Sequence, residues 1–399
     1  MKRNIVVTAA PTATHGSLRR VTRRETWRRR TAVPAADSFG EARWATPDDD
    51  AQLRRLARAV PMVGRVSYCL EREPDYFRLL RLQGNPAHAA VIDGRDEAVA
   101  MAACAVQSLT FAGQAERLLY TCDAKVHPAY RGQGLFGAIV ERALSEVDAL
   151  GVIAAYTLVL KGNRAMASMI ANGVRGMRFH RLATIRNFTL FLGRERALPA
   201  GSRVRPASIG DLPAMVALWQ RAASERHLCP DLSLEAFRTR FAQMPGLGPE
   251  SFRIVERGGE MTGFAAAWDL HPLKQVRLLG LSVPLRIVRA LYNPVARTAG
   301  RAPLPKFGEH LRFAYVMQLC ARSVEDARAL LVQLHNDLRG SALVYLDLAL
   351  DIRDPHLEAL RGFALSSVDF ELFLLTWKGG APASALPGDR PMYFEMGLV

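Results

Sequence analysis

The stretch that decides the fold is Val126-His127-Pro128-Ala129-Tyr130-Arg131-Gly132-Gln133-Gly134-Leu135-Phe136-Gly137. It lies between a predicted strand, 117–126, and a segment over 134–150 whose apolar residues recur with a helical period. Glycines at the start of a helix let successive main-chain N–H groups point into one concavity, which suits a pyrophosphate. Pro128 ends the hydrogen bonding of the strand. The stretch therefore predicts an anion site at a strand-to-helix turn.

Two other phosphate-binding motifs do not fit this stretch. It is not a P-loop, because no Gly-Lys-Ser/Thr follows it. It is not the dinucleotide motif GxGxxG, because it comes late in a mostly antiparallel order and no acidic residue ends the next strand.

The predicted elements form one order that occurs twice along the chain. In the first half the order is a strand, two helices, an antiparallel meander, and then strand–helix–strand–helix–strand, with elements over 41–45, 50–60, 74–82, 89–92, 98–110, 117–126, 134–150, 152–160, 163–172 and 186–192. A composition shift at 198–201 reads as a linker. The order then repeats over 204–206, 211–224, 233–243, 252–256, 261–269, 312–320, 324–338, 343–350, 355–362 and 367–376. This repetition predicts an α/β (α+β) protein with a duplicated fold.

The glycine-rich stretch resembles motif A of the GNAT superfamily of acyl-CoA N-acyltransferases. That motif is Arg/Gln-x-x-Gly-x-Gly/Ala after a strand that ends in Val-x-Pro. Arg131 and Gly134 match it, whereas Phe136 replaces the third small residue and Gly137 follows at once. The match covers about 41–195 in element order. The resemblance implies two tandem GNAT-like domains, each a mixed, mostly antiparallel sheet flanked by helices, and acetyl-CoA or another acyl-CoA as co-substrate.

The resemblance also implies which residues bind the acyl-CoA. Main-chain amides of seven consecutive residues would hold the pyrophosphate: Arg131, Gly132, Gln133, Gly134, Leu135, Phe136 and Gly137. The strand end, Lys125 and Val126, would pair with the pantetheine arm and present the acyl carbonyl. Asn163, after the next strand, matches the family's Asn on the pantetheine side.

The predicted domains are 41–197, which would bind acyl-CoA, and 202–399, a degenerate GNAT-like domain. At the equivalent place in the second half stands Ala321-Arg322-Ser323-Val324-Glu325-Asp326. Acidic residues there would repel phosphates, and no glycine is present. The second domain is expected to support the first and to wall the substrate cleft.

The acyl transfer needs a base that takes a proton from the attacking amine. Asp123 is the first candidate for this base, with Tyr120 and His127 behind it; the alternative for Asp123 is an ion pair with a neighbouring Arg. The family's thiolate acid is a Tyr seven residues after the Asn, where this chain has Ile170. Water or another side chain would then protonate the thiolate, or the domain no longer catalyses.

Charge is concentrated in two segments of a chain with net charge +15. Residues 1–46 hold ten Lys and Arg against three acidic residues, and residues 274–312 hold eight against one. Residues 1–40 are expected to be a basic disordered tail, for which nucleic-acid binding is not favoured. Residues 274–312 are a basic, amphipathic insertion. They would either lie on an anionic membrane, grip a lipid-like substrate, or pack as a helix between the domains with Arg outward, which is favoured.

These observations lead to one prediction of function and to alternatives. The prediction is a cytoplasmic N-acyltransferase, with acetyl as the expected acyl group, that acts on the primary amine of a small molecule. The alternatives are a catalytically weak acyl-CoA sensor or interaction protein, and an acyltransferase for a lipid-like or membrane-associated acceptor. No metal site is expected, because the nine His lack ligand spacing and the five Cys form no CxxC pair.

Overall fold

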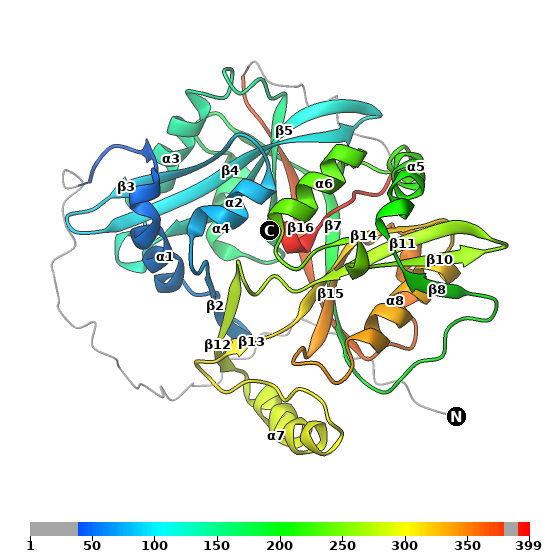
Figure 1. Ribbon diagram of the computed structural model, residues 1–399. Coiled ribbons are helices and arrows are strands. Elements are labelled where there is room, and N and C mark those ends of the chain that lie inside the picture. The colour runs from blue at the N-terminus through cyan, green and yellow to red at the C-terminus, as the bar shows by residue number, and fades with distance from the viewer. Residues whose placement is uncertain (1–38, 379–389) are drawn as a thin grey trace.

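The computed structural model describes residues 39–378 and 390–399, so the predicted basic tail lies outside the described residues apart from its last two positions. One large mixed sheet runs through the molecule, with helices on both faces (Figure 1). A second, three-stranded sheet lies below it. The architecture is the α/β arrangement that the sequence predicts.

The described part of the first half contributes seven strands and four α-helices. Its elements are β1 (Arg43–Trp44), α1 (Asp50–Ala59), β2 (Val66–Glu71), α2 (Tyr76–Gln83), β3 (Ala87–Asp93), β4 (Ala98–Phe111), β5 (Gln114–Val126), α3 (Leu135–Leu144), β6 (Ala154–Leu160), α4 (Arg164–Asn172) and β7 (Arg178–Phe191). Strands β1, β3, β4 and β5 pair antiparallel in that order, and β5 then pairs parallel with β6.

The second half repeats this pairing order. Its elements are β8 (Arg203–Pro206), α5 (Leu212–Ala223), β9 (Cys229–Pro230), α6 (Leu234–Gln243), β10 (Phe252–Arg257), β11 (Glu260–Trp268), β12 (Gln275–Leu281), α7 (Val283–Thr298), β13 (His310–Leu311), β14 (Ala314–Ala321), α8 (Val324–Asp337), β15 (Tyr345–Asp351), η6 (Pro355–Leu360) and β16 (Leu365–Thr376). Strands β8, β10, β11 and β14 pair antiparallel, and β14 then pairs parallel with β15.

The last strands of the two halves are exchanged at the centre of the sheet. The order there is β6–β16–β7–β15, so β16 of the second half pairs with β6 and β7 of the first. Strand β7 in turn pairs with β15 of the second half. The two predicted sheets are thereby joined edge to edge into one.

Helices cover both faces of the first half, which explains why its strands read as nearly continuous apolar runs. On one face, α1 and α2 pack on β3 and β4 through Leu53, Leu56 and Leu80. On the other face, α3 packs on the same strands through Leu135 and Ile139. The largest buried cluster spans both halves, from Leu118 and Tyr156 to Trp219, Phe264 and Leu374.

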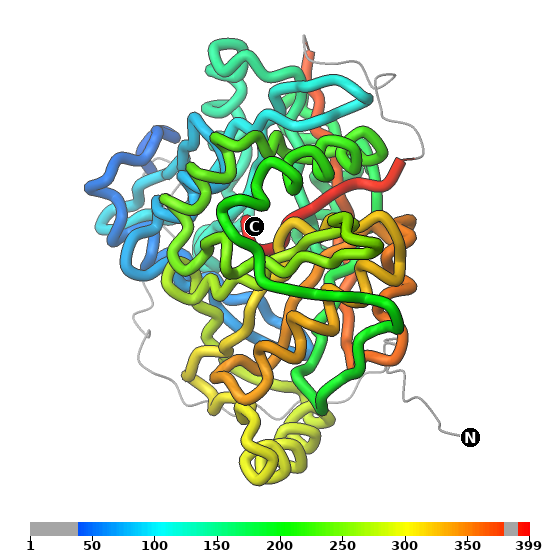
Figure 2. The backbone as a smooth tube through the Cα atoms, turned by 45° about the vertical axis from the view of Figure 1, so that its right-hand side comes forward, coloured from blue at the N-terminus to red at the C-terminus, as the bar shows by residue number. Residues whose placement is uncertain are grey.

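The insertion at 274–312 forms β12, α7 and β13. Strand β12 pairs with β2 of the first half, and α7 projects from the lower end of the molecule in two views (Figures 1 and 2). The favoured prediction, a helix that packs its apolar residues between the domains, is wrong: of the α7 residues, only Ala296 is buried.

Candidate active site

Strands β5 and β6 part beside the glycine-rich stretch. Their Cα pairing runs from Leu118↔Ala154 to Tyr120↔Tyr156, and none is present beyond it in the described chain. The hydroxyl of Thr157 donates to the main-chain oxygen of Thr121 at 2.9 Å, and this is the last bond across the gap. Beyond it β5 continues to Val126 without a partner on this side among the described residues, while β6 stays paired with β16 from Ala155 to Leu160. The β6-facing edge of β5 is therefore free to pair with an extended ligand.

A β-bulge distorts β5 at Asp123. Met101 pairs with Lys125 and Ala103 with Cys122, so β5 carries one extra residue there. Asp123 has φ +50°, a left-handed conformation that Asp tolerates better than most residues. Strand β14 bulges at the corresponding place, where Gln318 has φ +47°. The same irregularity therefore occurs at equivalent places in the two halves.

The glycine-rich stretch forms an open turn at the start of α3. Gly132 and Gly134 have φ +82° and +76°, and no heavy atom lies within 4 Å of where a β-carbon would stand at either. Gly134 is the N-cap of α3, so the free N–H groups of the first turn point out of this opening. Leu135 is buried and fixes the helix, whereas Arg131 is exposed. We refer to residues 131–137 as the glycine cradle.

The remaining predicted cradle residues lie at its edges. The side-chain oxygen Oε1 of Gln133 is buried and has no hydrogen-bond partner. Phe136 is half-buried, and Gly137 faces the guanidinium of Arg175, whose Nε lies 3.1 Å from where a β-carbon would stand. A larger residue at position 137 would push that guanidinium away.

Helix α4 follows β6 and contacts β7. Asn163 is its N-cap, and its Oδ1 accepts a hydrogen bond from the main-chain N–H of Ala165 at 3.1 Å. The amide nitrogen of Asn163 can still donate to a ligand. No residue of α4 is buried, which is unusual for a helix that flanks a sheet. Ile170, at the position of the family's Tyr, is half-buried.

Asp123 is held in a buried ion pair. Its Oδ2 accepts from Nη2 of Arg72 at 2.7 Å and from the Tyr76 hydroxyl at 3.3 Å, and Lys125 Nζ lies 3.5 Å from its Oδ1. Burial alone would raise the pKa of Asp123, but the charges of Arg72 and Lys125 outweigh it and hold the pKa well below its usual range. Nη1 of Arg72 is buried and has no partner.

Two further buried ionisable residues come from the second half: Lys274 interacts with this ion pair, and Asp347 interacts with Lys274. Burial lowers the pKa of Lys274 to about 7, and its Nζ donates to the main-chain oxygen of Val399 at 2.5 Å. Burial raises the pKa of Asp347 to about 7, although Asn187 Nδ2 donates to its Oδ1 at 2.8 Å. Lys274 interacts electrostatically with Arg72, Asp123 and Asp347. We name the five residues Arg72, Tyr76, Asp123, Lys274 and Asp347 the junction cluster.

The other two predicted catalytic residues lie outside the junction cluster. Tyr120 is buried against the ring of Tyr156, and burial raises its pKa well above the ordinary value. His127 caps the short helix after β5, and its Nδ1 accepts from the Ala129 N–H at 3.3 Å. The structure thus brings Asp123 together with charges that the sequence did not single out as site residues.

The comparisons with known proteins concern the fold. No protein-family model and no curated protein matches this chain. Among solved structures, a GCN5-related N-acetyltransferase from Sphaerobacter thermophilus aligns with a TM-score of 0.55 and 16% identity over 88% of this chain and 98% of its own. An N-myristoyltransferase from Saccharomyces cerevisiae with bound myristoyl-CoA aligns with a TM-score of 0.56 and 13% identity over 87% and 84%. The chain therefore has the GNAT fold.

Proposed function

We propose that this protein is an acyl-CoA-dependent N-acyltransferase that moves an acyl group to the primary amine of a small molecule. The observation that carries the proposal is the parting of β5 and β6 beside the open glycine cradle. A free strand edge suits the amide groups of pantetheine, and a helix N-terminus rimmed by glycines suits its pyrophosphate. The similar solved structures include an N-acetyltransferase and an N-myristoyltransferase that binds myristoyl-CoA.

We assign the same binding residues that the motif implied. Main-chain amides of 131–137 bind the pyrophosphate, Lys125 and Val126 pair with pantetheine, and Asn163 donates to it from the α4 side. The acyl carbonyl then lies at the end of β5, near the bulge at Asp123. The acceptor enters from the junction cluster, which connects Asp123 at the bulge with Lys274 and Asp347 of the second half.

The junction cluster supplies the proton acceptor in this proposal. The ammonium form of the acceptor loses one proton, and the free amine attacks the thioester carbonyl. The C–N bond forms and the C–S bond breaks, so that CoA leaves as a thiolate. The second proton of the nitrogen passes to water, and water protonates the thiolate. Asp123 stays ionised and holds Arg72, because a carboxyl with so low a pKa is a weak proton acceptor. Asp347 and Lys274, both with pKa near 7, suit this proton transfer better. The unpartnered Nη1 of Arg72 favours an acceptor that also carries a carboxylate.

Calorimetry with acetyl-CoA tests the cradle directly. We expect the wild type to bind and Gly134→Glu to weaken binding by about 100-fold or more, since it adds bulk and negative charge where several charge-assisted hydrogen bonds form. Gly201→Glu is the matched control, because Gly201 also has φ above zero and open space but lies in the linker. Failure of folded wild type to bind any acyl-CoA from acetyl to myristoyl would overturn the proposal.

A catalytically weak acyl-CoA sensor is the second candidate. The half-buried Ile170 at the position of the family's Tyr favours it. Binding that Gly134→Glu abolishes, with no CoA released from any acyl-CoA across a panel of amines and amino acids, would support the sensor over the enzyme.

A further inference from the structure

Helix α7 exposes its apolar face to solvent. At 100° per residue, Val283, Ile287, Val288, Leu291 and Val295 share one face of the helix. This face is exposed: Val283 is 63%, Ile287 57% and Leu291 69% accessible. A surface helix of a globular protein normally turns its apolar face toward the core. Here that face lies toward solvent.

The opposite face of α7 attaches to the protein through polar contacts. Asn293 Nδ2 donates to the main-chain oxygen of Leu304, and the Leu304 N–H donates to Asn293 Oδ1, both at 2.9 Å. The hydroxyl of Tyr292 donates to the main-chain oxygen of Ala302 at 3.3 Å. The guanidinium of Arg289 lies 5.2 Å from the ring centre of Phe307. These contacts fix the helix so that the apolar face stays outward.

Other exposed apolar residues gather around α7. Nine of the thirteen large apolar side chains exposed in the described chain belong to the helix or to segments that contact it: Val63, Val66, Leu279, Val283, Ile287, Val288, Leu291, Val295 and Phe307. The Ser282 N–H donates to the main-chain oxygen of Arg65, which brings the 63–66 segment to the start of α7. Such a concentration of exposed apolar side chains around one helix indicates an interaction surface.

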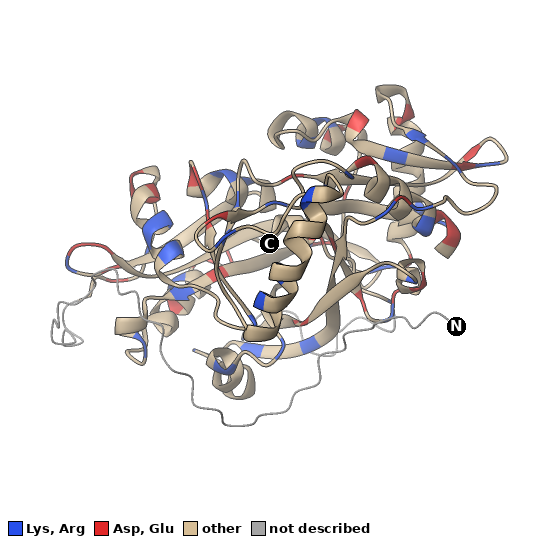
Figure 3. Ribbon diagram, turned by 90° about the horizontal axis from the view of Figure 1, so that it is seen from below, with Lys and Arg blue, Asp and Glu red and all other residues tan. Residues whose placement is uncertain are grey.

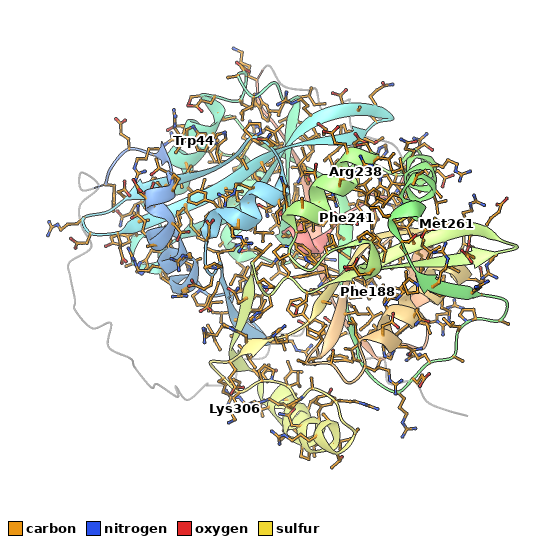
Figure 4. The ribbon with its side chains drawn as sticks, viewed as in Figure 1. Trp44, Phe188, Arg238, Phe241, Met261 and Lys306 are labelled. Atoms are coloured by element: carbon orange, nitrogen blue, oxygen red, sulfur yellow. The ribbon has the colours of Figure 1, made fainter. Side chains whose placement is uncertain are left out.

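The charges around this patch are positive. At 100° per residue, Arg286 and Arg297 lie on one edge of the apolar face of α7. Arg301 and Lys306 follow in the next loop, and Lys306 is seen beside the helix (Figure 4). Seen from below, α7 carries blue bands and no red one (Figure 3). Between Lys274 and Gly308 the chain holds no Asp or Glu. An apolar stripe bordered by cations complements a surface whose outer layer is anionic and whose layer beneath is apolar.

Two occupants from the protein itself fit less well. The chain outside the structure at residues 1–38 carries nine Lys and Arg against two acidic residues, so its charge opposes that of the patch. A second copy would bring two rows of Arg286 and Arg297 together. Five exposed residues on one helix are also few beside the roughly 20–30 residues per side of a stable dimer.

We propose that α7 lies on an anionic lipid surface, with its apolar face in the acyl-chain boundary and Arg286 and Arg297 at the headgroups. The helix is about 24 Å long at 1.5 Å per residue, enough for about four turns along the membrane plane. No helix in the described part of the chain is long and apolar enough to cross a membrane. The proposed contact lies along the membrane surface. It does not depend on which amine accepts the acyl group.

Tryptophan fluorescence with brominated lipids tests this contact in the full-length protein. Leu291→Trp places the probe in the centre of the apolar face, and Ile209→Trp places it on an exposed apolar site of the second half. We expect vesicles of phosphatidylcholine and brominated phosphatidylglycerol to quench the added emission of Leu291→Trp and not that of Ile209→Trp. Because both variants keep residues 1–38, binding through those residues contributes equally to both.

Two further measurements separate the contribution of the apolar residues of α7 from that of the lipid charge. Ile287→Ser/Val295→Ser in the Leu291→Trp protein should abolish quenching, and pure brominated phosphatidylcholine vesicles should quench weakly. Equal quenching of Leu291→Trp and Ile209→Trp, or none of either, would overturn the proposal. A blue shift of Leu291→Trp without vesicles, together with a dimer in sedimentation, would show that a second copy covers the helix instead.

Discussion

At the scale of single residues, the buried charges of the junction cluster have opposite environments. Asp123 has two cations within 3.5 Å, and its pKa falls. Asp347 has a neutral amide at 2.8 Å, and burial raises its pKa. A pair of carboxylates with pKa values pushed apart is a common pattern in acid–base catalysis. Of the two carboxyl groups, Asp347 is thus the one that can gain or lose a proton near neutral pH.

The pKa of Asp347 predicts how stability depends on pH. Its folded value, about 7, lies above the ordinary 3.8, so the folded state binds a proton that the unfolded state releases between these pH values. We therefore expect the stability of the wild type relative to Asp347→Asn to fall as pH rises from about 4 to about 7, with a slope of at most about 1.4 kcal/mol per pH unit. Urea unfolding across this pH range measures it.

Asp369→Asn is the matched control for Asp347→Asn. Asp369 pairs with Arg186 at 2.6 Å, and its pKa is lowered. Its contribution to stability is present above the ordinary carboxyl pKa and is lost only as pH falls below it, so this control should change little between about pH 4 and about pH 7. Parallel curves for the two variants would mean that Asp347 is ionised in the folded protein.

The residues of the glycine cradle could be predicted from the sequence, because neighbours in the chain form it. The junction cluster could not, because Arg72, Lys274 and Asp347 come together only through the tertiary fold. One signal was present in the sequence. Asp347 stands within the apolar run Leu346–Leu350, where burial of an unpaired charge would cost free energy. The proposed roles of Asp123, Tyr120 and His127 stay predictions.

At the scale of elements, α4 is the one α-helix of the described chain that has no buried residue. Its most covered apolar side chains, Met166, Met169 and Ile170, are only half-buried. A helix with so few buried contacts opens easily. An acyl-CoA bound between the cradle and Asn163 would cover this exposed face.

Hydrogen exchange should therefore respond to acyl-CoA in α4. At about 100 times Kd, bound ligand can slow exchange by up to about 100-fold where opening requires its release. We expect slower exchange in 163–172 and in the cradle, and no change in α8, which has eight buried residues. Slowing that is equal in α8 and α4 would indicate global stabilisation, and unchanged α4 would contradict the proposed site.

Most elements could be predicted from periodicity and turn residues, but several features could not. Strands β2 and β12 were missed, because each pairs with the other across the two halves of the chain. The two-residue strands β9 and β13 were missed as well. Strand β7 starts at Arg178, eight residues before its predicted start, because β16 pairs along its whole length. The orientation of α7 depends on polar contacts with the following loop, which the apolar periodicity does not reveal.

At the scale of the whole molecule, the exchange of β7 and β16 makes the halves interdependent. Three neighbouring strand pairs cross between them: β6 with β16, β16 with β7, and β7 with β15. Strand β12 also pairs with β2, and β9 with β4. The proposed acceptor site depends on this arrangement, because Asp123 comes from the first half and Lys274 and Asp347 from the second.

Cleavage of the linker at 198–201 tests this interdependence. Because each half supplies a strand to the other, we expect the fragments from a protease site inserted between Ala200 and Gly201 to stay together in size-exclusion chromatography and to separate only in denaturant. A single thermal transition should persist after cleavage, since neither half can complete its sheet alone. Two tandem domains with separate sheets would instead elute apart and melt independently. The intact chain with the same insertion, left uncut, controls for the insertion itself.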